Sequence, residues 1–326
     1  MFKFLKSKQS NDRGVQTPTP TPINAQALLA RMAWTSAKRL DGLMQGDYRT
    51  LFKGAGMMLA DLREYLPHDD VRHMDWNVTA RMQTPYVREH EQDRDLTAWF
   101  LVDLSASIGF GSGSVSKRTI MAEAVALLGH LLQRRGNRIG AVIDRADPKK
   151  NLDIIPARSG KHHLLHLLHR LLNHPLHQSP TPTSLKRLLT GAQRIVGRRA
   201  TVFVISDFLT APDWDKALIA LASRHDVVAI RLVDPLDQQL PNMGMLTLRD
   251  AETNQQVFID SGDPSFRRRF AQQTQDHENA LLRTLTRAGV DCLELSTNST
   301  AHEDLLQFIG QRQRFLRQTS TGPAHV

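Results

Sequence analysis

An aspartate and two serines at alternate positions follow a short apolar run near the end of the first third of the chain. Asp103, Ser105 and Ser107 come at and just after the end of the run 97–102, which is rich in aromatic and branched side chains. Such a run, bounded by polar residues, predicts a buried strand that ends at Asp103. One carboxylate and two hydroxyls at a strand end are oxygen ligands that suit a hard cation. They form half of a cation site, so the other ligands must come from elsewhere.

A second aspartate, Asp207, follows the continuously apolar run 200–205, which is typical of a central parallel strand. Ligands of open parallel sheets bind outside the carboxyl ends of the strands. If the two strands are neighbours, their ends and the loop between them predict one metal site. Its two carboxylates suit Mg²⁺, with Mn²⁺ or Ca²⁺ as alternatives, and leave a coordination position for an incoming carboxylate. The expected ligands are Asp103, Ser105, Ser107, Thr183 and Asp207.

Strands and helices alternate from residue 95 onward, which predicts an α/β domain with a mainly parallel sheet and right-handed crossovers. A hairpin insertion is expected near 245–259, around a turn-forming polar segment. Strands are expected near 95–104, 138–144, 152–155, 200–207, 226–232 and 290–295, and helices near 116–135, 160–173, 184–196, 213–223, 264–288 and 301–317.

The first 94 residues do not show this alternation of strands and helices. Residues 1–22 predict a flexible, basic, proline-rich arm, and 23–44 an amphipathic helix that packs on the main body. With residues 54–90 this helix is assigned to an accessory module spanning 23–94, ahead of the α/β domain at 95–318 and a flexible tail at 319–326. The segment 84–90 resembles an edge strand that leads into the central one.

Charges of both signs alternate with aromatic residues in the block 63–81, which predicts carboxylate–guanidinium pairs beneath aromatic cover. The block is either a self-contained structural network or a surface that couples the accessory module to the metal-bearing domain. On the second interpretation its arginines and aspartates hold the module against the metal face. The residues of this network are Arg63, Glu64, Tyr65, Asp69, Asp70, Arg72, Asp75, Trp76 and Arg81.

Composition narrows the class of protein. The chain has 326 residues, 40% of them hydrophobic, and a single cysteine, Cys292, which excludes an intramolecular disulfide. No run approaches the length of a membrane-spanning helix, and residues 1–6 are too short for a signal-peptide core, so a cytoplasmic protein is expected. Peripheral membrane contact through the basic arm stays open. The net charge of +9 suggests an acidic partner or simply a solvated basic surface.

Enzymatic motifs are incomplete. A phosphatase of the haloacid dehalogenase type needs a second acid two residues after Asp103, where this chain has Ser105. A phosphate-binding loop needs a glycine before Lys117, and none is present. The histidines at 162, 166 and 169 share a helix face and suggest either zinc or, more simply, a solvated face. No nucleic-acid-binding motif is present, so no nucleic acid is expected.

These residues resemble two related families. The set Asp103, Ser105, Ser107, Thr183 and Asp207 resembles the metal-ion-dependent adhesion site of von Willebrand factor A domains. The Arg/Asp/Trp block at 63–81 ahead of it, and the segment 233–241, resemble the bacterial domain of unknown function 58 family. The resemblance spans about Gly54 to Phe258 and implies a von Willebrand factor A-like fold.

The resemblance implies an interaction protein rather than an enzyme. Members of the family commonly accompany MoxR-type AAA+ ATPases, so it implies an adaptor whose metal binds an acidic residue of such an ATPase or of its client. A metal-dependent hydrolase, for example a phosphoesterase, is the alternative use of the same site. A nucleic-acid-binding protein that uses the basic surface is a third interpretation.

Overall fold

Six strands form one sheet in the computed structural model, which describes residues 4–6, 24–39, 62–67, 69, 71, 74–88, 96–134, 136–147, 150–175, 184–250 and 255–320. The spatial order is β11-β8-β7-β4-β5-β6, and all neighbours are parallel except β5 and β6. Numbered along the chain, this is the doubly wound order 3-2-1-4-5-6. The strands are β4 (Thr97–Asp103), β5 (Arg138–Asp144), β6 (Asp153–Arg158), β7 (Thr201–Ser206), β8 (Asp226–Val233) and β11 (Asp291–Ser296).

Helices cover both faces of this sheet, so its central strands are apolar on both sides. One face packs against α1 (Ala25–Arg39), α6 (Lys117–Gln133), α7 (Lys161–Asn173) and α12 (Ala301–Ser320). The other face packs against α8 (Leu185–Ile195), α9 (Asp215–Ala222) and α11 (Pro264–Ala288). This is the von Willebrand factor A-like α/β architecture that the sequence predicts.

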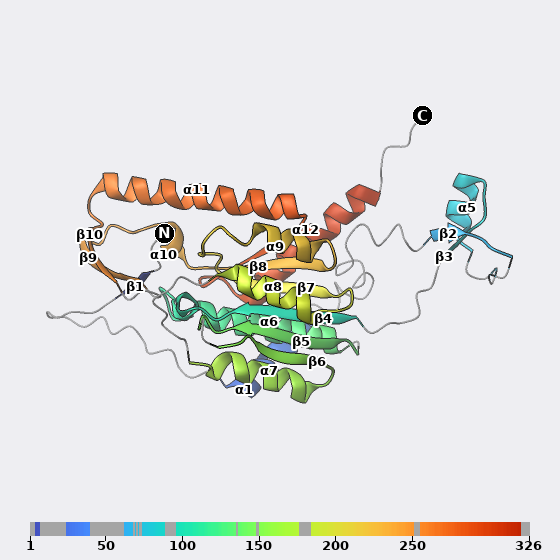
Figure 1. The fold of residues 1–326 in the computed structure, drawn as a ribbon, viewed down its shortest axis with the longest axis horizontal. Helices are drawn as coiled ribbons and strands as arrows, with labels where there is room; N and C mark the ends of the chain where they lie inside the picture. Colours follow the sequence, from blue (N-terminus) through green and yellow to red (C-terminus); the bar gives the residue numbers. More distant parts are fainter. Residues whose placement is uncertain are drawn as a thin grey trace.

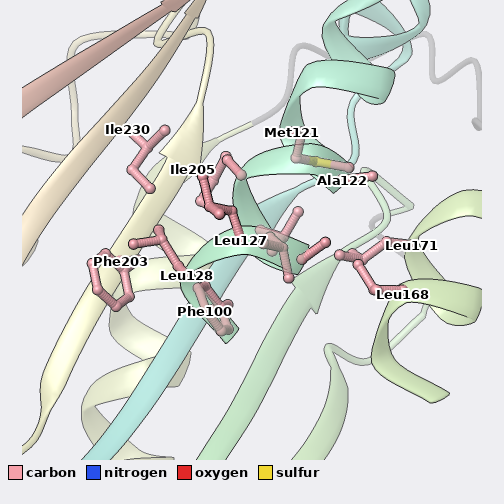
Figure 2. Close-up of a cluster of buried hydrophobic side chains, with 14 of the residues drawn as sticks. Phe100, Met121, Ala122, Leu127, Leu128, Leu168, Leu171, Phe203, Ile205 and Ile230 are labelled. Carbon is pink, nitrogen blue, oxygen red and sulfur yellow. The ribbon is translucent and has the colours of Figure 1, made fainter. Parts of the chain in front are cut away.

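Strand β4 shows how the two layers share one strand. Its alternate residues Phe100 and Val102 enter the layer beneath α6, whereas Trp99 and Leu101 enter the layer beneath α8. The rings of Phe100 and Phe203 stack with centroids 5.3 Å apart. Figure 2 shows these two rings beside the leucines of α6. Central β4 is therefore held from both sides, and its carboxyl end is placed by the core.

The helices and strands expected after residue 95 are present. The expected hairpin is formed by β9 (Met245–Asp250) and β10 (Gln256–Asp260), with the short α10 (Pro235–Gln238) before it. Residues Phe4–Lys6, expected within a flexible arm, form β1 and pair with β9. Helix α1 packs on α6 and α7 through Leu28, Leu29 and Met32, so it belongs to the main body rather than to the accessory module.

The accessory module consists of β2 (Leu62–Glu64), α5 (Trp76–Met82) and β3 (Tyr86–Arg88). Strand β3 pairs with β2 in a separate two-stranded sheet, which corrects the expectation that it flanks the central sheet. Figure 1 draws this module at the end of the molecule opposite α10 and the β9–β10 hairpin. The reason is topological: β3 precedes the amino end of β4, and a seven-residue strand separates its two ends by about 23 Å.

The predicted network in this module is seen only in part. Asp69 accepts a hydrogen bond from the Leu66 amide, and the largely buried Asp75 accepts one from the Val78 amide. Trp76, expected as aromatic cover, is 66% exposed, which corrects that expectation. Arg63 and Glu64 lie in β2, Tyr65 follows it, and Arg81 lies in α5; Asp70 and Arg72 lie outside the described residues.

Among the helices that the structure describes, none is both long and apolar enough to cross a membrane. The expected localisation stays a prediction.

Candidate metal centre

The carboxyl ends of β4 and β7 lie side by side at the centre of the sheet. Val102 is in register with Ile205, so Asp103 stands next to Ser206 and one residue before the level of Asp207. Strand order reverses between these two strands, because the chain leaves β4 toward β5 and returns on the other side at β7. Open α/β sheets bind ligands at this switch point. The condition set by the sequence, that the two strands are neighbours, is therefore met.

Asp103, Ser105 and Ser107 form a compact, buried group. Asp103 Oδ1 accepts a hydrogen bond from the Ser105 amide at 3.0 Å, which fixes the carboxylate against the turn that follows β4. The hydroxyl oxygens of Ser105 and Ser107 lie 2.9 Å apart. Exposed fractions are 5% for Asp103, 0% for Ser105 and 2% for Ser107. The three predicted ligands from this strand are thus brought together.

Ser206 and Phe208 join β7 to this group, and the sequence analysis missed both. The Ser206 hydroxyl donates to Asp103 Oδ2 at 2.9 Å and accepts from the Phe208 amide at 3.0 Å. Phe208 has φ of 56°, a left-handed conformation that is uncommon for a bulky side chain. Its ring is buried against Trp214, with centroids 5.6 Å apart. Strained backbone held by packing is often found at functional sites.

Asp207 has a positive partner that the sequence did not predict. The Lys117 ammonium, at the start of α6, lies 3.3 Å from Asp207 Oδ2 and 2.6 Å from Asp237 Oδ2. Burial alone would lower the pKa of Lys117, but the two carboxylates outweigh it and raise that pKa above its ordinary value. Burial and the nearby charge of Asp207 together raise the pKa of Asp237 above its ordinary value in spite of the ammonium. Asp207 therefore shares its cation with Asp237, whereas the Asp103 side chain accepts hydrogen bonds from the Ser105 amide and the Ser206 hydroxyl.

Asp144, beside Asp103 at the end of β5, has its own cation. The Arg187 guanidinium, in the first turn of α8, donates to both Asp144 carboxylate oxygens, with Nε to Oδ2 at 2.8 Å. Both carboxylate oxygens of Asp144 therefore have a hydrogen-bond donor within the protein. The same contact brings the start of α8 to this edge of the sheet. Thr183, the fifth predicted ligand, lies just before α8 but outside the described residues.

Asp234, in the segment 233–241 that resembles the family, contacts the loop that follows β4. It is fully buried, and its Oδ2 accepts from the Ser112 hydroxyl at 3.0 Å and the Thr297 hydroxyl at 2.7 Å. Asp237 Oδ2 accepts from the Asp234 amide at 3.0 Å. The two aspartates of this segment therefore fix the loop after β4 and orient Lys117.

The other predicted chemistry finds less support. In the part of the chain that the structure describes, no three His, Cys, Asp or Glu side chains gather as metal ligands, so the histidine face of α7 forms no zinc cluster there. Burial raises the pKa of the Cys292 thiol to about 11, so the thiol is protonated and weakly nucleophilic at neutral pH. The candidate site between β4 and β7 brings together the oxygens of Asp103, Ser105, Ser107 and Ser206.

The strand order and the helices on both faces define a von Willebrand factor A-like α/β fold. The model of a family described as "Protein of unknown function DUF58" matches residues 61–280, and the chain belongs to this family. An uncharacterised protein of Mycobacterium tuberculosis is 36% identical over 288 residues, which are 88% of this chain and 90% of that protein. An uncharacterised protein of Mycobacterium avium is 33% identical over 49% of this chain and 94% of its own.

Solved structures with similar arrangements include BatB of Bacteroides thetaiotaomicron, with a TM-score of 0.43 and 14% identity over 67% of this chain and 99% of that one. A von Willebrand factor A domain of SpRpn10 has a TM-score of 0.39 and 11% identity over 66% of this chain and 95% of its own.

Proposed function

We propose that this protein is an interaction module that binds Mg²⁺ through Asp103, Ser105, Ser107, Thr183 and Asp207, and through the ion an acidic residue of a protein partner. Mn²⁺ and Ca²⁺ are alternatives of the same ligand class.

The two serine hydroxyls carry the proposal. Their oxygens lie 2.9 Å apart, beside the buried carboxylate of Asp103. Adjacent oxygen ligands of an octahedral Mg²⁺, each at about 2.1 Å from the ion, lie about 3.0 Å from one another. The serine pair therefore has the spacing of two neighbouring ligands without rearrangement.

The charge at this edge supports a divalent cation. Asp103 is a carboxylate with neutral donors, whereas Lys117 shares its charge between Asp207 and Asp237. If all four groups are ionised, their net charge is −2, which a dication would balance. Such an ion keeps an affinity for one more oxygen ligand, and a partner carboxylate is the chemistry that fits.

The partner follows from family resemblance rather than from geometry. A MoxR-type AAA+ ATPase, or a client of such an ATPase, is the partner we propose, with this chain as its adaptor. Use of the same ion for hydrolysis is the alternative that the experiment below distinguishes.

Isothermal titration of the full chain with Mg²⁺ tests the metal step. The Asp103→Asn variant keeps the side-chain shape and the acceptor for the Ser105 amide, but it removes the charge and replaces the acceptor of the Ser206 hydroxyl with a donor. Ser105→Ala removes one hydroxyl ligand. Each is expected to weaken Mg²⁺ binding at least tenfold. Asp276→Asn, on the exposed face of α11, is the matched control and should bind as the parent does.

Capture of a purified MoxR-type ATPase from the same genome, with Mg²⁺ and with chelator, tests the partner step. Capture that requires Mg²⁺ and is lost in Asp103→Asn supports the adaptor. Metal-dependent turnover of a phosphoester that is lost in the same variant would instead establish the hydrolase. Mg²⁺ binding unchanged by both ligand variants would refute the site.

A further inference from the structure

A second site lies at the edge of the sheet, two strands away from β4. A pocket of about 270 Å³ opens between the edge strand β6 and helix α7. It is smaller than most drug-sized ligand pockets but large enough for a small molecule. Its lining residues are Asp153, Ile154, Ile155, Pro156, Arg158, His163, His166 and Arg170.

The lining carries more positive than negative charge. Arg158 and Arg170 face the pocket, and Asp153 is its one carboxylate. That carboxylate is already shared, because Arg170 and Arg145 both donate to Asp153 Oδ2, the latter at 2.6 Å. Burial opposes ionisation of Asp153, but these two hydrogen bonds outweigh it and hold its pKa below the usual range.

Hydrogen-bond donors here outnumber the acceptors. Among the described residues the exposed Arg158 has no carboxylate partner. His163 donates Nε2–H to the Ile139 carbonyl at 2.9 Å, and burial lowers the pKa of its ring, so Nδ1 is an acceptor and His163 offers the pocket no further donor. A guanidinium has five N–H donors, so one shared carboxylate satisfies few of those present. The site therefore lacks an anion rather than a cation.

A metal ion does not fit this pocket. The described residues contain no group of three His, Cys, Asp or Glu side chains arranged as ligands, although His163, His166 and Asp153 all line it. Two guanidinium groups at the rim would repel a cation. Addition of a peptide strand to β6 is also disfavoured, because Pro156 lies in the middle of the edge strand and lacks an N–H.

We propose that this pocket binds a small molecule that carries a phosphate group. Guanidinium groups recognise phosphate through parallel charge-assisted hydrogen bonds, and Arg158 and Arg170 supply them from β6 and α7. The side chains of Ile154 and Ile155 provide an apolar surface for the part of the ligand that bears the phosphate.

Isothermal titration of the full chain with inorganic phosphate and with pyrophosphate, at low ionic strength, tests this site. Arg158→Gln and Arg170→Gln are each expected to weaken binding at least tenfold. Arg158 is exposed and Asp153 keeps Arg145 when Arg170 is replaced, so both variants should fold, as circular dichroism and thermal melting would verify. Arg224→Gln, another exposed arginine, is the control and should not change the affinity.

Vesicles that contain phosphatidic acid form a second arm, which separates a free phosphate compound from a lipid headgroup. Phosphate or pyrophosphate binding that depends on Arg158 and Arg170 supports the proposal, and competition with the vesicles would identify the headgroup as a further source. Absence of binding by either probe up to millimolar concentration, or equal binding by the parent and both arginine variants, would overturn it. Asp103→Asn should leave this binding unchanged, so its outcome is independent of the metal site.

Discussion

Lys117 is the buried charge on which the candidate metal centre depends most. Its side chain is 1% exposed and reaches Asp207 from the first turn of α6, 90 residues earlier in the chain. Asp237 provides the second carboxylate. A buried ammonium fixes the positions of its two carboxylate partners. Removing any one of the three charged groups destabilises the fold, because it leaves a buried charge without its partner. The lysine therefore positions the Asp207 carboxylate.

We expect Lys117→Met to destabilise the protein by about 3–5 kcal/mol, because it leaves two buried carboxylates without a cation. Urea unfolding at pH 7 measures this. Because the pKa of Lys117 is raised in the folded state, its contribution is fully present below about pH 10.4 and is lost only as the pH rises through the folded-state value.

Lys186→Met is the matched control for this prediction. Lys186 is 58% exposed and 4.0 Å from Asp213, so its replacement should change the stability by less than about 1 kcal/mol. Equal effects of the two substitutions would mean that the Lys117 ion pairs do not stabilise the fold.

Strand β5 shows how closely the elements around the site are packed. A Cβ added at Gly140 would lie 2.9 Å from the Trp99 ring on β4 and 3.0 Å from the Ala157 backbone nitrogen on β6. Neither neighbour can withdraw easily, because one is a buried ring and the other is main chain. Gly140 thus permits the close approach of three strands, on which the positions of Asp103 and of the β6 pocket both depend.

Gly140→Ala should therefore cost about 1–3 kcal/mol of stability, the usual cost of overpacking. Thermal melting of the variant beside Gly197→Ala makes the comparison, since a Cβ at Gly197 meets nothing within 4 Å. A melting temperature for Gly140→Ala equal to that of Gly197→Ala would show that the three strands can move apart to admit the added Cβ without loss of stability.

At the scale of the whole molecule, helix α1 completes the core although it lies far ahead of the sheet in the sequence. Leu28, Leu29 and Met32 are 2–4% exposed and belong to the same apolar cluster as α6 and α7. The guanidinium of Arg31 also pairs with Glu123 on α6. The N-terminal part of the chain is thus divided: α1 belongs to the main body, and the small β2–α5–β3 module lies apart from it (Figure 1).

Leu29→Ala should lower the free energy of unfolding by about 2–5 kcal/mol, as expected for a large-to-small change in a core. Denaturant unfolding monitored by tryptophan fluorescence measures the effect, and Ala30→Ser, at an exposed position of the same helix, serves as control. If Leu29→Ala unfolds at the parent's denaturant concentration, α1 is dispensable for the stability of the sheet domain.

Local patterns in the sequence determined the order of the elements and the two strand ends. The apolar runs before Asp103 and Asp207 predict buried strands because continuous burial on both faces requires apolar side chains at every position. That these two ends are neighbours stayed a condition in the sequence analysis, and the strand order of the sheet meets it. The pairing of β3 with β2 was not predicted, because short strands of mixed polarity do not reveal their partners.

The sequence alone determined which residues could serve as metal ligands, since Asp103, Ser105 and Ser107 are neighbours in the chain and share one turn. Only the tertiary structure decided which partner each carboxylate has: Asp207 and Asp237 share Lys117, Asp144 pairs with Arg187, and Asp103 accepts a hydrogen bond from the Ser206 hydroxyl, 103 residues away. The physical reason is that the local sequence around a strand-end aspartate is the same whether its partner in the fold is a metal ion, an arginine or a hydroxyl. Packing of distant elements selects that partner, and with it the chemistry of the site.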